Sequence, residues 1–302
     1  MLVLTHPACL DHDPGPDHPE RPARLSEVTA ALHTAFPDLE WREAPVAKLG
    51  DLGRVHEREQ IDAILEPRFD GHRMLDMDTV MSPRSHLAAL RAAGAGIAAV
   101  DAVMNEQAGS VFCAVRPPGH HATGQASMGF CLFNNIAVAA AHARDVHGLE
   151  RIAIVDFDVH HGNGTQAIFE RDPRVQYLSS HQSGLYPYSG GVYERGVGNV
   201  HNVLLPPGSG SFRFRNLWAD QMLPLVDAFR PQLLLISAGF DAHLRDPQAD
   251  LMLEAEDFGW LTRELSQIAD RHAGGRVVSM LEGGYDLQAL RESSVAHVGA
   301  LR

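Results

Sequence analysis

Short apolar segments, each followed at once by histidine, aspartate or tyrosine residues, recur along this chain. Five of these segments have the composition of strands: residues 111–115, 152–157, 175–178, 233–237 and 277–281. Amphipathic stretches that indicate helices occur at residues 22–36, 85–105, 134–147, 212–229 and 256–272. Strands that are apolar on both faces and separated by helices are typical of a parallel sheet covered by helices. The pattern therefore predicts the α/β class, with an open, mostly parallel sheet flanked by helices on both faces.

Length and composition limit what kind of protein this can be. The 302 residues contain no internal repeat, low-complexity tract or long flexible linker, so residues 1–302 are predicted to form a single domain. Hydrophobic residues make up 45%, which is enough for a large buried core. The formal charge of −13, from 25 Lys+Arg and 38 Asp+Glu, disfavours a surface that binds nucleic acid or anionic lipid. No nucleic-acid or membrane partner is expected, whereas a homo-oligomer is left open.

Three widely spaced cysteines, Cys9, Cys113 and Cys131, fit neither a disulfide framework nor a cysteine-based zinc site. Cys113 lies in an apolar run and is expected to be a buried, reduced thiol. The first residues lack the basic start and long apolar stretch of a signal peptide. The most apolar helical stretch, around residues 87–103, is interrupted by charged residues and glycines, which argues against a membrane span. These features predict a cytoplasmic protein.

The polar residues that follow the strands lie where a ligand site is expected. Residues 111–115 lead into RPPGHH, residues 152–157 into DVHHGNG, residues 233–237 into AGFDAH, and residues 277–281 into EGGYD. In open parallel sheets, ligands bind at the carboxyl ends of the strands. Four strands therefore deliver His, Asp and Tyr side chains to one edge of the sheet, which indicates a functional site rather than packing.

Asp156, Asp158 and His160 alternate along the end of one predicted strand, so their side chains point to the same side. A carboxylate and an imidazole on one face can share a metal ion, and a third protein ligand completes a catalytic zinc site with one open position for water. Asp241, just beyond another strand, is the best candidate for that ligand. An isolated D-x-H sequence is more often capping or solvated. Its combination with Asp241 and the neighbouring histidine pair favours a metal site.

His120 and His121 follow a stiff Pro-Pro-Gly turn that fixes their directions. Hydrolysis of an amide needs a base for the attacking water and an acid for the leaving amine, and two imidazoles near a metal can divide these tasks. Each imidazole needs a partner for its other ring nitrogen. Asp156 can orient His120 and Asn163 can orient His121, although the sequence alone does not decide these pairings.

Tyr285 follows two glycines at the end of the last predicted strand, where the backbone can bend and bring the ring over a cleft. Its hydroxyl can polarise a substrate carbonyl and stabilise the developing oxyanion. A single GGY sequence is more often a surface turn. The predicted role of Tyr285 therefore depends on the residues around it.

Other histidines and glycines are interpreted as structural. Three histidines near the start of the chain alternate with aspartates and are interpreted as a solvated loop: His6, His12 and His18. Three more lie near predicted helix ends, where a cation suits the helix dipole: His142, His147 and His272. Residues 56–60 are interpreted as a solvated helix face. Gly94 and Gly96 indicate close helix packing rather than a phosphate-binding loop.

Five motifs follow one another along the chain: RPPGHHA, GFCLFNN, DFDVHHGNGTQ, SAGFDAH and LEGGYD, preceded by HPERPARL at residues 18–25. In this combination the chain resembles the histone deacetylase and acetylpolyamine amidohydrolase superfamily, over residues 18–290. The resemblance is closest to class II and bacterial members, since class I relatives usually have Asp where this chain has Asn163. It implies an arginase/deacetylase-like fold and a metal-dependent deacetylase.

The resemblance also implies roles for individual positions. The implied zinc ligands, with ferrous iron as an alternative metal, are Asp158, His160 and Asp241. The implied acid–base pair is His120 and His121, backed by Asp156 and Asn163, and Tyr285 is the implied carbonyl-polarising residue. The implied substrate-binding residues are Gly129 and Phe130 along the acyl-lysine tube, Tyr186 on the facing wall, Asp78 at the rim, and Arg24 beneath the pocket on the acetate exit path.

Members of this superfamily also carry monovalent cations, and the resemblance implies two potassium sites. The ligands implied for the first are the main-chain oxygens of Asp156, Asp158, His160 and Ser180 with the Ser179 hydroxyl. Those implied for the second are main-chain oxygens near Phe169, Asp172 and Val175. Residue spacing alone does not indicate potassium.

Two other functions compete with this one. An arginase-like ureohydrolase with two manganese ions needs more ligands than follow Asp241, where His243 is the one candidate for an extra ligand. A non-catalytic acyl-lysine-binding protein would not need a competent residue at every catalytic position. In this chain every candidate catalytic position holds one, which disfavours that function. The substrate is left open between acetyl-lysine of a protein or peptide, an acetylpolyamine and another small acetyl-amine. Polyamine-selective relatives tend to carry an acidic residue where this chain has Gln248, which favours acetyl-lysine.

Overall fold

Eight strands form one sheet in the order β2-β1-β5-β10-β9-β6-β7-β8, and each neighbouring pair is parallel. The computed structural model describes residues 1–66 and 69–302. The strands of this sheet are β1 Leu2–Thr5, β2 Glu40–Glu43, β5 Ser110–Cys113, β6 Ile152–Asp156, β7 Val175–Gln182, β8 Val200–Leu205, β9 Leu233–Ala238 and β10 Val277–Leu281. Two short strands, β3 Arg73–Met74 and β4 Val80–Met81, pair antiparallel outside it.

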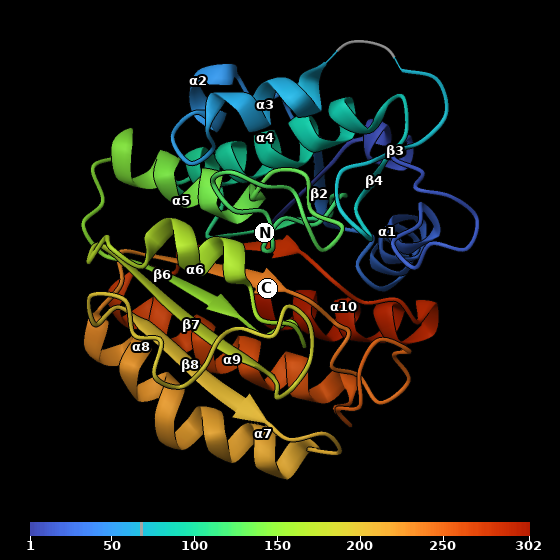
Figure 1. The fold of residues 1–302 in the computed structure, drawn as a ribbon. Coiled ribbons are helices and arrows are strands. Elements are labelled where there is room, and N and C mark those ends of the chain that lie inside the picture. Colours follow the sequence, from blue (N-terminus) through green and yellow to red (C-terminus); the bar gives the residue numbers. More distant parts are fainter. Residues whose placement is uncertain (67–68) are drawn as a thin grey trace.

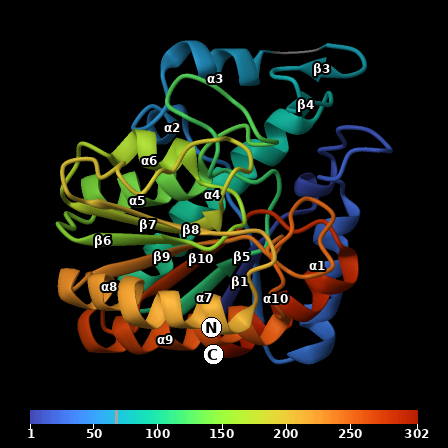
Figure 2. The same cartoon turned by 60° about the horizontal axis from the view of Figure 1, so that its bottom comes forward.

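Helices cover both faces of the sheet. In Figures 1 and 2, α2 to α6 lie on one side of the strands, and α7 to α10 lie on the other side. The α-helices are α1 Ala23–Ala35, α2 Leu49–Leu52, α3 Arg58–Leu65, α4 Ser85–Met104, α5 Asn135–Asp145, α6 Asn163–Phe169, α7 Ser211–Leu217, α8 Leu223–Phe229, α9 Ala255–His272 and α10 Leu287–Leu301. Helix α1 packs against α10. A 3₁₀ turn, Pro7–Leu10, follows β1. The predicted fold class, an open parallel sheet between two helical layers, is confirmed.

The central strands and most long helices lie where the sequence predicts them, with small differences at their ends, except that β7 continues to Gln182 beyond the predicted 175–178. The helix predicted at residues 212–229 is interrupted, because a π-helical segment, Trp218–Met222, separates α7 from α8. The indole of Trp218 donates a hydrogen bond to Ser180 Oγ on β7 at 3.0 Å. Strands β1, β2, β3, β4 and β8 and helices α2, α6 and α10 are not among the elements predicted from the sequence.

Helix α4 is long and apolar enough, by length and composition, to cross a membrane, so the interruptions noted in the sequence do not decide the question. In the structure this helix packs against α5, β5, β10 and β1, and most of its small apolar side chains are buried. Such burial is usual for a core helix. A Cβ at Gly94 would overlap the carbonyl of Pro45, and a Cβ at Gly96 would crowd Ala139 on α5, so the prediction of close helix packing is confirmed.

Two polar segments interpreted as solvated are partly buried. His12 lies 2.7 Å from Ser85 Oγ and 3.3 Å from the carboxylate of Glu20, so the solvated-loop interpretation is wrong for His12. His56 and Gln60 are also buried, although the three residues between them are exposed. His56 Nε2 accepts a hydrogen bond from the backbone of Asn134, just before α5. Each buried histidine is satisfied by a partner distant in sequence, which local patterning does not reveal.

The three cysteines are buried and free, which confirms the buried thiol predicted for Cys113; the burial of Cys9 and Cys131 was not predicted. His142 lies in the last turn of α5 and His272 ends α9, while His147 lies just beyond α5. The prediction that these three histidines lie near helix ends is confirmed.

Candidate active site

The loops that follow β5, β6, β9 and β10 meet at the carboxyl edge of the sheet. Asp156 is the last residue of β6 and pairs in register with Ser179 on β7 and Ser237 on β9. The motifs of the sequence therefore come together because adjacent parallel strands end at the same edge. Asp158 and His160 follow β6, and the side chains described below surround them.

Asp158, His160 and Asp241 form a buried group in which one ligand atom from each residue lies within 4.8 Å of the others. His160 Nδ1 lies 3.0 Å from Asp158 Oδ1 and 3.2 Å from Asp241 Oδ2. Backbone amides hold the remaining carboxylate oxygens, since Gly283 donates to Asp158 Oδ2 and Val159 donates to Asp241 Oδ1, both at 2.9 Å. The carboxylates are thus fixed in orientation with one oxygen each directed at the imidazole.

The donor chemistry of this group fits a divalent cation. Burial and the neighbouring Asp158 carboxylate raise the pKa of Asp241, because two anions close together in a buried site repel each other. A bound cation removes that repulsion. A Cβ at Gly239 would overlap Asp158, and one at Gly283 would overlap Asp241, so both glycines are needed to leave space for the ligands. One imidazole and two carboxylates suit zinc or ferrous iron.

His120 and His121 lie side by side, with ring centroids 4.0 Å apart, but their Nδ1 partners differ. His120 Nδ1 lies 3.0 Å from Asp156 Oδ2, whereas His121 Nδ1 lies 2.8 Å from Asn163 Oδ1. The structure therefore brings together both pairs that the sequence left undecided. Tyr177 on β7 also donates to Asp156 Oδ2 at 3.0 Å and helps to orient that carboxylate.

The different partners give the two imidazoles different charge preferences. Burial lowers the pKa of His120, but the carboxylates of Asp156 and Asp158 outweigh burial and raise it to about 10. Burial, together with the charges of His120 and His160, lowers the pKa of His121 well below its usual value. A carboxylate partner stabilises an imidazolium and an amide partner does not. The pair consists of one ring that favours the charged form and one that favours the neutral form.

Tyr285 is 8% exposed and lies over the guanidinium of Arg24, which is 4.8 Å from the ring centroid. The carboxylate of Asp246 accepts a hydrogen bond from the backbone of Tyr285 at 2.7 Å and fixes the loop. Burial raises the pKa of Tyr285 well above its usual value. Arg24 is fully buried and donates to the carbonyls of Glu282 and Gly284 and to Glu20, so its charge is held rigidly beneath the ring.

The residues predicted to form a substrate tube surround His121 and Tyr285. The Phe130 ring lies 5.8 Å from that of Tyr285, and the Tyr186 ring lies 5.2 Å from that of His121, measured between centroids. Gly129 has a φ of 56°, and a Cβ there would overlap the His121 ring, so only glycine fits. Among the described residues, the buried Tyr186 hydroxyl has no hydrogen-bond partner, which leaves it available to a ligand.

Asp78 lies next to Phe130 at the surface. It helps to line a surface cavity of about 480 Å³ together with His18 and Phe130, and its carbonyl lies 3.0 Å from His18 Nε2. Gln248 is half-buried in the loop that follows Asp241, and its backbone donates to Asp246. Asp246 therefore holds the backbones of both Gln248 and Tyr285.

The two predicted potassium sites differ in the structure. At the first, Asp156 and Ser179 are adjacent in register, and the Ser179 hydroxyl lies 2.9 Å from His181 Nδ1, so this site stays a prediction. At the second, the carbonyls of Phe169, Asp172 and Val175 do converge, but on the Asn199 amide, whose Nδ2 lies 2.8, 3.0 and 2.7 Å from them. This amide takes the place of a cation, so the residues there do not fit potassium.

Glu282, a fully buried carboxylate in LEGGYD, is not among the site residues predicted from the sequence. Its Oε2 accepts from the backbone amides of Gly119 at 2.7 Å and His120 at 3.2 Å, and its Oε1 accepts from Ser237 Oγ at 3.1 Å. Burial raises the pKa of Glu282 to about 7. The sequence signal for Glu282 was a charged residue between a mostly apolar strand and two glycines, because such a residue must find buried partners.

Comparisons with known proteins identify the family of this chain. A family model described as the histone deacetylase domain matches residues 18–301. The chain is 40% identical over 284 residues to the histone deacetylase-like amidohydrolase of Pseudomonas aeruginosa, over 92% of this chain and 74% of that protein. It is 39% identical over 294 residues to the human polyamine deacetylase HDAC10, over 91% of this chain and 43% of that protein. The crystal structure of the HDA15 HD domain matches with a TM-score of 0.94 and 34% identity, over 99% of this chain and 87% of that chain.

A parallel α/β sheet with a buried His and Asp group at its carboxyl edge is suited to a metal-dependent hydrolase, and these matches define the family. This chain belongs to the histone deacetylase family, and it is a hydrolytic deacetylase. The ureohydrolase and the non-catalytic binding protein, which the sequence left open, are therefore not supported. In the described residues, His243 is not part of the ligand group; it lines a surface cavity with Leu244 and Arg245.

The contacts of Glu282 lead to a first prediction. Glu282→Ala removes the acceptor that holds the turn carrying His120, and we expect kcat to fall by about 10²-fold, the scale of a small misplacement of a catalytic group. Glu282→Gln should stay within about threefold of the wild type, because its carbonyl can accept from Gly119 and His120 while its amide donates to Ser237. Steady-state kinetics and melting temperatures of the three proteins test this. Equal impairment of both variants would show that the charge matters and not the hydrogen bonds.

Proposed function

We propose that this chain is a mononuclear, zinc-dependent deacetylase that removes acetyl groups from acetyl-lysine in proteins or peptides. The observation that carries the proposal is the meeting of a buried ligand group, two histidines with different partners and Tyr285 at one edge of the sheet. Asp158, His160 and Asp241 would hold the zinc ion, and ferrous iron suits the same donors. When bound, the metal polarises the substrate carbonyl and makes a water molecule more acidic.

The two histidines are assigned different tasks in this proposal. Asn163 is neutral, so it orients His121 without stabilising its protonated form, and His121 can take the proton of the attacking water and give it to the leaving amine. The Asp156 carboxylate favours a protonated His120. Charged His120 then stabilises negative charge as it develops on the carbonyl oxygen.

The substrate is positioned by residues around the histidines. The Tyr285 hydroxyl donates to the carbonyl oxygen, while Gly129, Phe130 and Tyr186 enclose the aliphatic chain of an acyl-lysine. The carboxylate of Asp78, at the rim, would accept hydrogen bonds from the substrate backbone. Arg24 lies beneath Tyr285, where its positive charge attracts the acetate product.

Potassium at the first of the two implied sites is part of the proposal. Its ligands would be the main-chain oxygens of Asp156, Asp158, His160 and Ser180 and the hydroxyl of Ser179. An ion there would tie the end of β6 to β7 and steady the loop that carries two of the proposed zinc ligands.

We also propose that the protein is cytoplasmic and binds neither nucleic acid nor membranes. This proposal is based on the formal charge of −13 and on the composition.

Acetyl-lysine is proposed over acetylpolyamines because Gln248 is neutral. An acylated polyamine carries at least one more ammonium group, and a neutral side chain gives that group no charge attraction. The name of one relative, a polyamine deacetylase, makes acetylpolyamines the second candidate. A comparison of kcat/KM for an acetyl-lysine peptide and for acetylated putrescine and spermidine decides between them. A much larger value for the polyamines would overturn the choice of substrate.

Gln248→Glu provides a second prediction. A carboxylate at this half-buried position attracts a second ammonium by about 1 kcal/mol, so kcat/KM for acetylated spermidine should rise by about fivefold relative to the acetyl-lysine peptide. Gln107→Glu is the matched control, since Gln107 is exposed before the amino end of β5, at the opposite edge of the sheet from the site. An equal change in both variants would indicate only an effect of net charge.

A further inference from the structure

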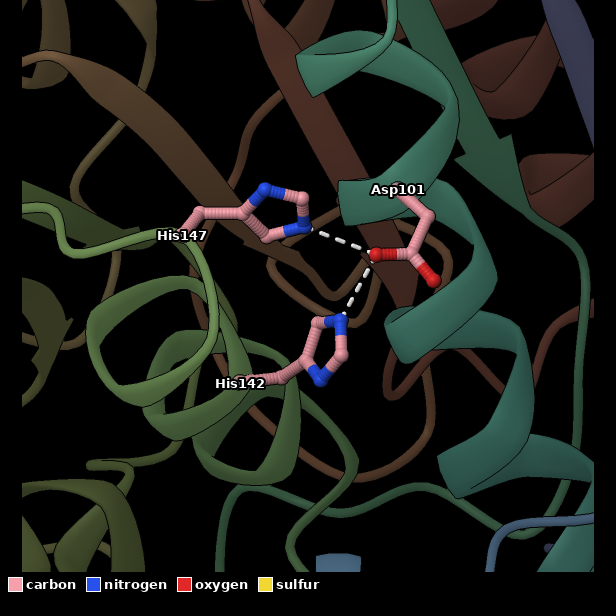
Figure 3. A group of neighbouring side chains, drawn as sticks. All are labelled: Asp101, His142 and His147. Carbon is pink, nitrogen blue, oxygen red and sulfur yellow. Dashed lines mark hydrogen bonds and ion pairs between the residues drawn. The ribbon is translucent and has the colours of Figure 1, made fainter.

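A second group of metal-ligating side chains lies where α4 and α5 pack together. It consists of Asp101 on α4, His142 in the last turn of α5 and His147 just beyond α5, which we call the Asp101 cluster (Figure 3). Both histidines direct Nε2 at the same atom, Asp101 Oδ1, each at 2.7 Å. Nothing in the deacetylation reaction uses these residues.

We propose that the Asp101 cluster is a second site for a divalent metal ion of the zinc, nickel or copper type. An imidazole donates a hydrogen bond and ligates a metal along the same direction, so two rings that aim at one oxygen also aim at one metal position. Metal–nitrogen distances are about 2.0–2.1 Å, so an ion can lie close to the point that Oδ1 now occupies. The carboxylate then has to turn aside and bind as the third ligand.

The surroundings of the cluster permit that rearrangement. The Asp101 side chain is 44% exposed and has space to rotate, whereas those of His142 and His147 are 8% and 17% exposed. His142 is held on α5 against α4, so its ring direction is set by helix packing. Two imidazoles and one carboxylate are a donor set that borderline metal ions prefer, and the exposed side leaves positions for water. The ion would find two ligands already aligned and would have to reorient only one.

One nearby charge opposes binding. Arg54 Nη1 lies 3.5 Å from His142 Nδ1 and can donate to that nitrogen only while it carries no proton. When Nε2 of a neutral imidazole binds a metal, Nδ1 carries the proton, so Arg54 has to turn away. Asp51 Oδ1 at 2.7 Å and Asp145 Oδ2 at 4.0 Å offer it other partners. Arg54 therefore weakens the site without blocking it.

The cluster is separate from the active site. Asn134, the residue that caps the start of α5, donates to the carbonyl of Ala122 beside the catalytic histidines. His142 and His147 belong to the other end of this helix, and 11 helical residues span about 16 Å. Metal bound at the cluster would thus stabilise the contact between α4 and α5 without replacing any group of the active site.

Isothermal titration of the full-length protein, already loaded with its active-site metal, with Zn²⁺ tests the proposal. We expect one further Zn²⁺ per chain, with affinity at least about tenfold weaker in His147→Gln and Asp101→Asn, because each loses one of three ligands. His272→Gln is the matched control: His272 also lies at a helix end, 18% exposed, and contacts one carboxylate, that of Asp227. It should bind Zn²⁺ like the wild type.

Two more results separate a metal site from a purely structural hydrogen-bonded cluster. Added Zn²⁺ should raise the melting temperature of the wild type but not that of His147→Gln. Arg54→Gln should tighten Zn²⁺ binding by about fivefold, because it removes a nearby positive charge. Absence of the further Zn²⁺ from the wild type, or its retention in both ligand variants, would overturn the proposal.

Discussion

His121→Ala is expected to lower kcat by about 10³-fold and to leave KM within about threefold of the wild type, since general acid–base groups contribute on this scale and act on the reaction rather than on binding. The reason is the neutral partner of this ring. Asn163 orients His121 through Nδ1 at 2.8 Å and leaves Nε2 free to accept a proton, whereas His120 faces the Asp156 carboxylate. Steady-state kinetics on an acetyl-lysine peptide measure the effect.

The metal content and melting temperature of the His121→Ala protein should match those of the wild type, because His121 is not one of the three ligands. Asn163→Asp is an independent test. A carboxylate beside Nδ1 stabilises the imidazolium, so the pKa of His121 rises and the acid limb of the pH–rate profile should move to higher pH. The proposed division of tasks would be wrong if kcat fell by about 10³-fold in His120→Ala while His121→Ala retained most of the wild-type kcat.

The parts of the fold that the sequence predicted well are those with strong local signals. Strands β6, β9 and β10 are apolar at nearly every position, and the polar motifs begin where they end. Strand β2 was missed because it lies at an edge of the sheet and its sequence, EWRE, is mostly charged and largely exposed. The π-helical segment Trp218–Met222 has no local signature either, since its indole contact with Ser180 spans 38 residues.

The convergence of the candidate site residues was predictable because each motif contributes its residues at the end of a strand, and neighbouring parallel strands end together. The buried hydrogen bonds that hold these residues in place could not be predicted from the sequence. Glu282 reaches Gly119 across more than 160 residues, and Glu20 accepts from both Arg24 and Arg116. The sequence can indicate that a buried carboxylate needs hydrogen-bond partners, but only the fold shows which residues these are.

The second potassium site shows a limit of transferring roles position by position. Phe169, Asp172 and Val175 are present, and their carbonyls converge as the resemblance implies. The difference arises from Asn199, which belongs to another segment and fills the centre with its amide. A ligand set can therefore be retained while a residue outside the motif replaces the ion.

Tyr285→Phe is expected to lower kcat by about 10²–10³-fold, the usual effect of removing one oxyanion donor, with a much smaller change in KM. The substitution removes one oxygen and keeps the ring, so the contacts with Arg24 and Phe130 are retained. Metal content should not change, because the hydroxyl is not part of the ligand group. Tyr193→Phe, at a residue 90% exposed, is the matched control and should have wild-type activity.

The pH dependence of this variant distinguishes a hydrogen-bond donor from a proton-transfer group. Burial raises the pKa of Tyr285 well above its usual value, so the phenol keeps its proton throughout the working range and donates at every pH. The ratio of wild-type to Tyr285→Phe activity should therefore be constant from pH 6 to pH 9, whereas loss of a group that transfers protons changes the shape of the profile. A ratio that varies with pH, or a loss confined to KM, would mean that Tyr285 has a role other than polarising the substrate carbonyl.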